Sequence, residues 1–197
     1  MTLRQYLMIR WTFVKKAFQL GRRLTEAEMH EAAAQAINEA QVLASLVGAI
    51  TITWAQVELN LDVINGILIG RGELNDRELP VSLKPKIAFF KKAFVKVAEV
   101  AHLDERALLI VAELNRLKLI RHDIIHGVAM DRTQIGARKF IRVEYRGADL
   151  VFRHQDYKFP AITEALADMV KLKGNLFALF RDTLFVISPD AAKQTFG

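Results

Sequence analysis

One heptapeptide of the chain combines residue types that can act on an RNA phosphodiester. It reads Arg-His-Asp-Ile-Ile-His-Gly and runs from Arg121 to Gly127. A planar, permanently charged guanidinium suits a phosphate, and a histidine exchanges a proton near neutral pH. His126 would deprotonate the ribose 2′-hydroxyl or protonate the leaving 5′-oxygen, and Arg121 would stabilise the charge that builds on the phosphorane. Because the 2′-hydroxyl is itself the nucleophile, this chemistry needs no nucleophilic side chain.

The spacing of these residues limits how they can meet. Residues five apart lie about 140° from each other around a straight helix. Arg121 and His126 can still converge if the helix loosens near Gly127, and a second copy of the helix could also face the first across a two-fold axis. His122 and His126 are four apart and share one helix face. The arginine-to-histidine spacing alone is a weak signal, and its position at the end of a predicted core helix strengthens it.

Hydrophobic periodicity predicts that most of the chain is helical. The predicted helices cover residues 1–23, 25–70, 83–100, 105–126 and 160–185. Thr25 and Glu28 match a capping box at the start of the second helix, and Gly127 is expected to end the fourth. After the motif the helical period gives way to an alternation of side chains between two faces over residues 139–145. A second, returning strand is expected over residues 150–153. This pattern predicts a β-hairpin at about 138–154.

These elements suggest three parts along the chain. Residues 1–24 form a basic amphipathic helix or arm, residues 25–187 a single helical domain, and residues 188–197 a loose tail. We expect the N-terminal helix to pack on the domain, with a membrane-surface helix or an RNA-contacting arm as alternatives. The lysines of the helix over 83–100 form either an RNA-facing patch or an ordinary solvated face.

Composition excludes several classes of function. The chain has no cysteine, which excludes disulfides, thiolate metal sites and cysteine nucleophiles. No uninterrupted apolar stretch reaches the length of about 18 to 20 residues that spans a bilayer, and the basic N-terminus lacks a signal-peptide pattern. We therefore expect a cytoplasmic protein with no membrane partner. The formal net charge of +6 favours some attraction to phosphates or anionic surfaces.

The motif and its surroundings resemble the HEPN superfamily of helical domains. An arginine, a polar residue, a short variable stretch and then His-Gly stand at the end of a core helix, as in that family. Upstream, the segment Trp54-Ala55-Gln56-Val57-Glu58, followed by Leu61-Asp62, resembles the first core helix of bacterial members. The lysine-rich helix over 83–100 resembles the second. The resemblance covers about residues 45–185, with a hairpin inserted after the motif helix.

This resemblance implies a mainly α fold, a bundle of four to five core helices with an inserted β-hairpin. It implies that Arg121 and His126 are the catalytic pair of a metal-independent endoribonuclease that uses no cofactor. His122 or Asp123 stands where the family has a supporting polar residue, usually asparagine. The implied partners are RNA, a second copy of the chain in a homodimer and, for a toxin, an antitoxin protein. Toxin, phage-defence and RNA-processing roles all occur in the family, as do inactive members.

Other interpretations of the same residues remain open. Arg121 could pair with Glu58 or Asp62 of the first core helix, and His126 could cap a helix end. His122 and His126 have a zinc-like helical spacing, but a third ligand would have to come from elsewhere, for example from a carboxylate or from one of the histidines at positions 30, 102 and 154. We expect no metal site.

A non-catalytic RNA- or protein-binding module is the main alternative to an enzyme. The predicted hairpin carries the cations Lys139, Arg142, Arg146 and Arg153 and the aromatic residues Phe140, Tyr145 and Phe152. Cations interleaved with aromatic rings are typical of surfaces that bind single-stranded RNA. An ordinary amphipathic hairpin has the same pattern.

Overall fold

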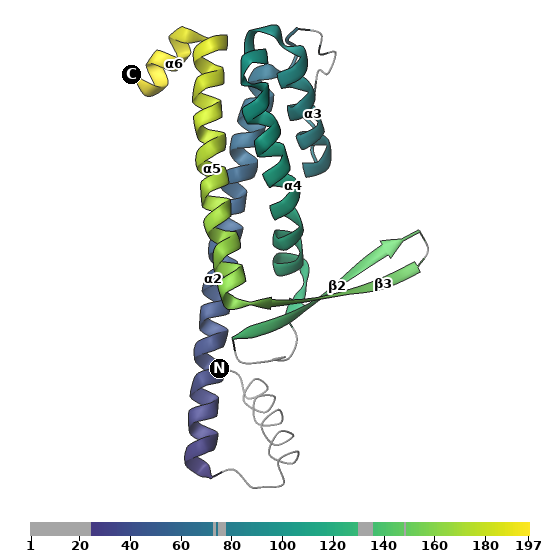
Figure 1. The fold of residues 1–197 in the computed structure, drawn as a ribbon, viewed down its shortest axis with the longest axis vertical. Helices are drawn as coiled ribbons and strands as arrows, with labels where there is room; N and C mark the ends of the chain where they lie inside the picture. The colour runs from purple at the N-terminus through teal and green to yellow at the C-terminus, as the bar shows by residue number, and fades with distance from the viewer. Residues whose placement is uncertain (1–24, 73, 75–77, 130–135, 148) are drawn as a thin grey trace. The chain divides into compact units, whose positions relative to one another are not determined.

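The computed structural model describes residues 25–72, 74, 78–129, 136–147 and 149–197, with only the backbone of Arg146 (Figure 1). The elements in chain order are α2 (Glu26–Leu68), α3 (Leu83–Lys96), a 3-10 helix η1 (Ala98–Leu103), α4 (Asp104–His126), β1 (Val128–Ala129), β2 (Ala137–Arg146), β3 (Asp149–Lys158), α5 (Phe159–Ile187) and α6 (Pro189–Phe196). The prediction of a mainly α fold with an inserted hairpin is confirmed. The helix expected over residues 1–23 lies outside the described residues.

The chain divides into two compact units, residues 1–46 and 47–197, and the division falls inside α2. In the first unit the predicted capping box is confirmed. The Thr25 backbone N–H donates to Glu28 Oε2 at 2.8 Å, and the Glu28 N–H donates to Thr25 Oγ1 at 3.3 Å. Each residue thus satisfies a free backbone donor of the other at the start of the helix.

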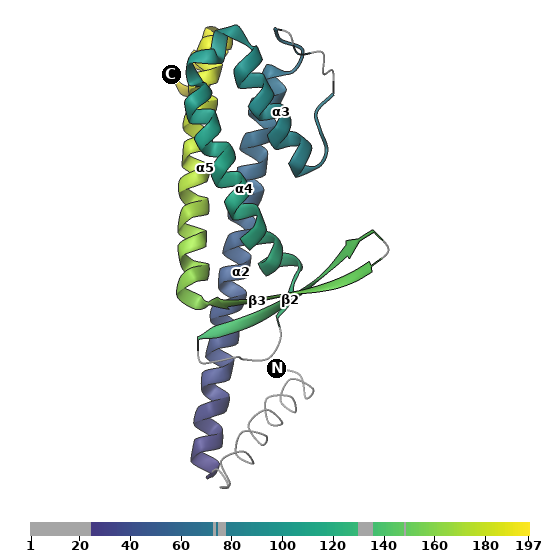
Figure 2. The same ribbon diagram turned by 45° about the vertical axis from the view of Figure 1, so that its right-hand side comes forward.

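The core of the second unit lies between α2, α3, α4 and α5. In Figures 1 and 2, the part of α2 that belongs to this unit runs side by side with α4 and α5. The apolar stripe of α2 is buried, with Trp54, Val57 and Leu61 at 1% exposure or less. Polar contacts join α2 to its neighbours, since Lys86 of α3 pairs with Asp62 at 2.6 Å and Asn60 donates to the Lys173 carbonyl of α5 at 3.5 Å.

By length and composition alone, α2 also contains a stretch that is apolar enough to cross a membrane. Core helices of soluble proteins pass the same test, so this stretch is a weak indication and does not establish where the protein resides.

The three strands form one antiparallel sheet in the order β1-β2-β3. The sheet lies at the end of the bundle where α4 ends and α5 begins (Figures 1 and 2). Gly147, with a φ of 65°, stands in the turn between β2 and β3. The expected alternation of β2 is present, and Phe140 and Arg142 are on its buried side. Val143 and Tyr145 are on the exposed side, at 47% and 78% exposure, so the inward face carries the charges.

The C-terminal segment is not the loose tail that the sequence suggested. Residues Pro189–Phe196 form α6, in which Ala192 is fully buried. The ring of Phe196 lies 5.9 Å from that of Phe177 and 5.6 Å from that of Phe180. Because Pro189 stands in the first turn of α6, where its missing N–H costs nothing, it permits this second helix after α5. The expectation of a loose tail over 188–197 is therefore wrong.

Candidate functional site at the end of helix α4

The structure brings Arg121 and His126 into direct contact. Arg121 Nη1 lies 3.0 Å from His126 Nε2. The helix does not need to loosen for this, because α4 continues to His126 and the long arginine side chain crosses the angular gap. A guanidinium can only donate hydrogen bonds. In this contact His126 Nε2 is therefore the acceptor.

Arg121 has no carboxylate partner among the described residues. Its Nε is buried and has no hydrogen-bond partner in the same part of the chain. The two carboxylates considered as partners from the sequence are engaged elsewhere. Glu58 accepts from Trp54 Nε1 at 2.5 Å, and Asp62 pairs with Lys86. The structural role suggested for Arg121 through these residues is therefore wrong, and its guanidinium keeps a donor face for an anion.

His122 and His126 lie together, as their spacing predicts. The ring centroids are 4.7 Å apart with an interplanar angle of 63°, an edge-to-face arrangement, and both residues are exposed. The pKa of His122 is lowered, first by partial burial and then by the positive charge of Arg142, with further contributions from His126 and Arg121. His122 is therefore neutral at pH 7 and able to accept a proton.

Asp123 points the other way, into a charged cluster under the hairpin. It is 2% exposed. Tyr157 of β3 donates its hydroxyl to Asp123 Oδ2 at 2.9 Å, and Arg142 Nη1 of β2 lies 3.2 Å from Oδ1. Arg142 also pairs with Glu144, and Arg153 lies 3.9 Å from Glu144 Oε1. Asp123 therefore fixes the hairpin to the turn of α4 that carries the two histidines.

This cluster explains a register that would otherwise be unfavourable. Arg142 and Arg153 stand directly opposite each other on β2 and β3, and like charges in such a pair repel. Asp123 and Glu144 supply one negative charge for each arginine. Burial and the bond to Asp123 raise the pKa of the Tyr157 hydroxyl well above its usual range, so Tyr157 remains a donor at all ordinary pH values.

The four hairpin cations that were expected to bind RNA differ in how accessible they are. The prediction is wrong for Arg142: its side chain is 8% exposed and is held by Asp123 and Glu144, so it is not available to RNA. Arg153 is 40% exposed and borders the same cluster. Lys139 is on the other face of β2, opposite Asp156. The side chain of Arg146 lies outside the described residues.

Gly127 is needed for close approach and not for an unusual backbone angle. It follows the last residue of α4 with φ −78° and ψ 145°, and its N–H bonds to the Asp123 carbonyl at 3.0 Å. A Cβ at this position would overlap that carbonyl oxygen and lie 3.2 Å from Phe140 Cβ. The glycine thus lets the chain turn tightly from the motif helix into β1.

No local sequence pattern identifies the partners of Asp123. Nothing in the sequence marks Glu144 or Tyr157 as part of a site, and the alternation predicts Arg142 at the surface. One signal was present: a buried aspartate must be paired with a cation or hydrogen-bond donors, and the alternation of β2 and β3 places charged residues and a tyrosine on one face.

Within the part of the chain that the structure describes, no three His, Cys, Asp or Glu residues form a group that could hold a metal ion.

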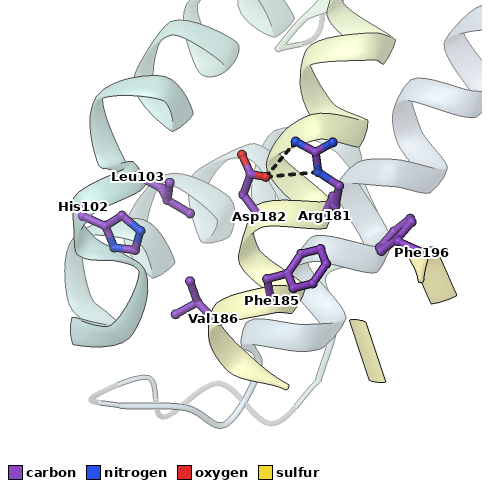
Figure 3. Close-up of a pocket in the computed structure, with 7 residues that line it drawn as sticks. All are labelled: His102, Leu103, Arg181, Asp182, Phe185, Val186 and Phe196. Carbon is purple, nitrogen blue, oxygen red and sulfur yellow. Dashed lines mark hydrogen bonds and ion pairs between the residues drawn. The ribbon is translucent and has the colours of Figure 1, made fainter. Parts of the chain in front are cut away.

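A hollow lies at the opposite end of α4 from the motif, between η1, α5 and α6 (Figure 3). Its lining residues are His102, Leu103, Arg181, Asp182, Phe185, Val186 and Phe196. The charges in this hollow are already paired: Asp182 lies 2.6 Å from Arg106 and 3.2 Å from Arg181. Hydrogen bonding to Arg106 lowers the pKa of the Asp182 carboxyl. Both charged lining side chains are thus engaged in ion pairs, and His102 is the remaining polar group of the lining. The motif end of α4, where a cation and two histidines meet, is therefore the better candidate site.

No match to this chain was found among protein-family models, curated proteins or solved structures. The HEPN assignment and the catalytic roles therefore remain predictions drawn from the residues and their geometry.

Proposed function

We propose that this chain is a metal-independent endoribonuclease of HEPN type in which Arg121 and His126 act on the scissile phosphodiester. The observation that carries the proposal is the 3.0 Å contact between Arg121 Nη1 and His126 Nε2. It brings a permanent cation and an acid–base group together on an exposed helix end. The absence of a carboxylate partner for Arg121 among the described residues supports it, because the guanidinium is then able to bind a phosphate.

The chemistry follows from what each group can do. The phosphodiester anion competes with His126 for the hydrogen-bond donors of Arg121. The guanidinium then donates to the phosphate oxygens and no longer to His126 Nε2. His126 Nε2 is then able to move a proton at the ribose hydroxyl or at the leaving oxygen. The ribose 2′-oxygen attacks phosphorus and the bond to the 5′-oxygen breaks. The products carry a 2′,3′-cyclic phosphate and a 5′-hydroxyl, and Arg121 stabilises the extra negative charge of the phosphorane.

The proposal includes a homodimer that acts in the cytoplasm without a cofactor. A second copy of α4 across a two-fold axis would bring two Arg121–His126 pairs to one cleft. A toxin or defence role, with an antitoxin protein as a further partner, is consistent with an exposed nuclease site that needs no metal. The net charge of +6 favours attraction of RNA to the protein.

The test is cleavage of structured and single-stranded RNA in the presence of EDTA. We expect products with 2′,3′-cyclic phosphate ends, and a loss of at least about 100-fold in rate for Arg121→Ala and for His126→Ala. His102→Gln is the matched control, because His102 is an exposed histidine at the other end of the bundle. Full activity in both site variants would contradict the assigned site.

An inactive HEPN-like binding module is the alternative, and one observation favours it. The outward face of the hairpin carries Tyr145, Leu150 and Phe152 at 78%, 49% and 55% exposure. Exposed aromatic rings on a sheet can stack on RNA bases or contact a protein. In that case Tyr145→Ser with Phe152→Ser would weaken binding to single-stranded RNA, and Arg121→Ala with His126→Ala would leave the binding unchanged. Binding would be measured by fluorescence anisotropy.

A further inference from the structure

The site contains one more acid–base group than the proposed function uses. His122 lies on the same face of α4 as His126, with ring centroids 4.7 Å apart. Both side chains are exposed, so both are accessible to the same substrate. Cleavage by the 2′-hydroxyl requires two proton transfers, one from the nucleophile and one to the leaving oxygen. A single histidine can serve only one of these at a time.

The charges around His122 favour a neutral ring. On α4 it faces Arg121, His126 and Asp123, and from β2 it faces Arg142. The negative charge of Asp123 is already shared with Arg142 and with the Tyr157 hydroxyl. The remaining balance is positive, and it lowers the pKa of His122 together with partial burial. His126 contributes to this effect from the same helix face, at a ring separation of 4.7 Å.

From this juxtaposition we infer that His122 is a second catalytic residue: it is the general base that takes the 2′-hydroxyl proton, and His126 is the general acid that protonates the leaving 5′-oxygen. The inference rests on the proposed function and assigns its two proton transfers. It also gives Asp123 and Arg142 a positioning role, because they hold the turn of α4 from which both histidines project.

The reaction balances with these two groups alone. His122 takes the proton of the 2′-hydroxyl, the 2′-oxygen forms a bond to phosphorus, and the bond from phosphorus to the 5′-oxygen breaks. The 5′-oxygen receives the proton of His126. After product release, His122 gives its proton to water and His126 regains one. In the reactive complex the Arg121 guanidinium donates its hydrogen bonds to the phosphate and no longer to His126. His126 Nε2 is then able to carry the proton that the leaving oxygen receives.

The test compares two leaving groups in an RNA oligonucleotide that the wild-type protein cleaves at one site. One substrate is ordinary RNA, and in the other a sulfur replaces the leaving 5′-oxygen at that site. A thiolate leaves without being protonated, so loss of the general acid no longer matters. We expect His122→Gln and His126→Gln each to lower the rate on ordinary RNA by about 100-fold or more. On the sulfur substrate His126→Gln recovers to near the wild-type rate and His122→Gln remains slow.

The pH dependence gives a second readout that a purely structural role would not change. We expect the wild-type kcat/KM to rise with pH as His122 loses its proton, and this limb to be absent in His122→Gln. His102→Gln is the control for loss of a histidine, and circular dichroism checks that each variant is folded.

The outcomes separate the inference from the proposed function. A wild-type rate for His122→Gln on ordinary RNA, or recovery of His122→Gln on the sulfur substrate, would overturn the base assignment while RNA cleavage by Arg121 and His126 stands. No cleavage of any RNA by the wild-type protein would overturn the proposed function, and the inference with it.

Discussion

Asp123 is the residue whose environment most constrains the site. It is 2% exposed and lies between Arg142 and the Tyr157 hydroxyl. Removal of one member of a buried ion pair costs about 3 to 5 kcal/mol, because the other charge remains buried. Since Glu144 still pairs with Arg142, we expect Asp123→Ala to lower the free energy of unfolding by about 3 kcal/mol. Urea denaturation would measure it.

The control for this change is Asp156→Ala. Asp156 is an exposed aspartate on the other face of β3, so its removal costs under about 0.5 kcal/mol. Equal effects of the two substitutions would show that the buried cluster does not hold the hairpin to α4.

Tyr157 makes the stability of the fold sensitive to high pH. Burial and the bond to Asp123 raise its pKa above the ordinary value of 10.0. The folded state therefore keeps a proton that the unfolded chain loses, so the contribution of Tyr157 is complete below pH 10 and decreases as the pH rises above it. We expect the unfolding free energy of the wild-type protein to fall more steeply above pH 10 than that of Tyr157→Phe. Parallel curves would contradict the assigned bond.

At the residue scale, the sequence predicted the pair that could do chemistry but not what supports it. Arg121 and His126 are close in the chain, so helix geometry relates them directly. Asp123 meets Arg142 and Tyr157 only after the hairpin folds back, at separations of 19 and 34 residues along the chain. The choice of which alternating face turns inward depends on that contact, which no local pattern contains.

The element scale is governed by the junction between α4 and β1. Gly127→Ala would place a Cβ against the Asp123 carbonyl and against Phe140, so the junction must shift. We expect a loss of about 1 to 3 kcal/mol and a displaced His126. Gly174→Ala in α5 is the matched change, because it has open space and should stabilise the helix by about 0.5 to 1 kcal/mol. Thermal unfolding of both variants would measure the change in stability relative to the wild-type protein. A stabilising effect of Gly127→Ala would contradict the tight junction between α4 and β1.

The elements themselves were largely predictable. The 3.6-residue period of α2, α4 and α5 and the capping box at Thr25 are local signals, and all of these helices are present. The helix predicted over 83–100 was too long: α3 ends at Lys96, and residues 98–103 form the 3-10 helix η1. The apolar periodicity continues across this break because Val97, Val100 and Leu103 are all buried. Helix and 3-10 turns bury such residues equally well, so the pattern does not separate them.

At the scale of the whole molecule, the C-terminal helix α6 packs at the end of the second unit that lies opposite the site. Phe196 contacts the rings of Phe177, Phe180 and Phe185. We expect Phe196→Ala to cost about 1 to 2 kcal/mol, less than a fully buried phenylalanine, because its ring is only half-buried. Lys193→Ala, an exposed position in α6, is the control. RNA cleavage should be unchanged in both variants, since the site is at the other end of α4.

The central claim is that Arg121 and His126 act as one unit on RNA. Its most direct test is the rate of RNA cleavage in EDTA by the wild-type protein, Arg121→Ala, His126→Ala and the double variant. Groups that act as a unit give non-additive losses. The account predicts that each single variant loses at least about 100-fold and that the double variant is scarcely slower than either. Losses that multiply in the double variant, or cleavage that persists in all three, would contradict it.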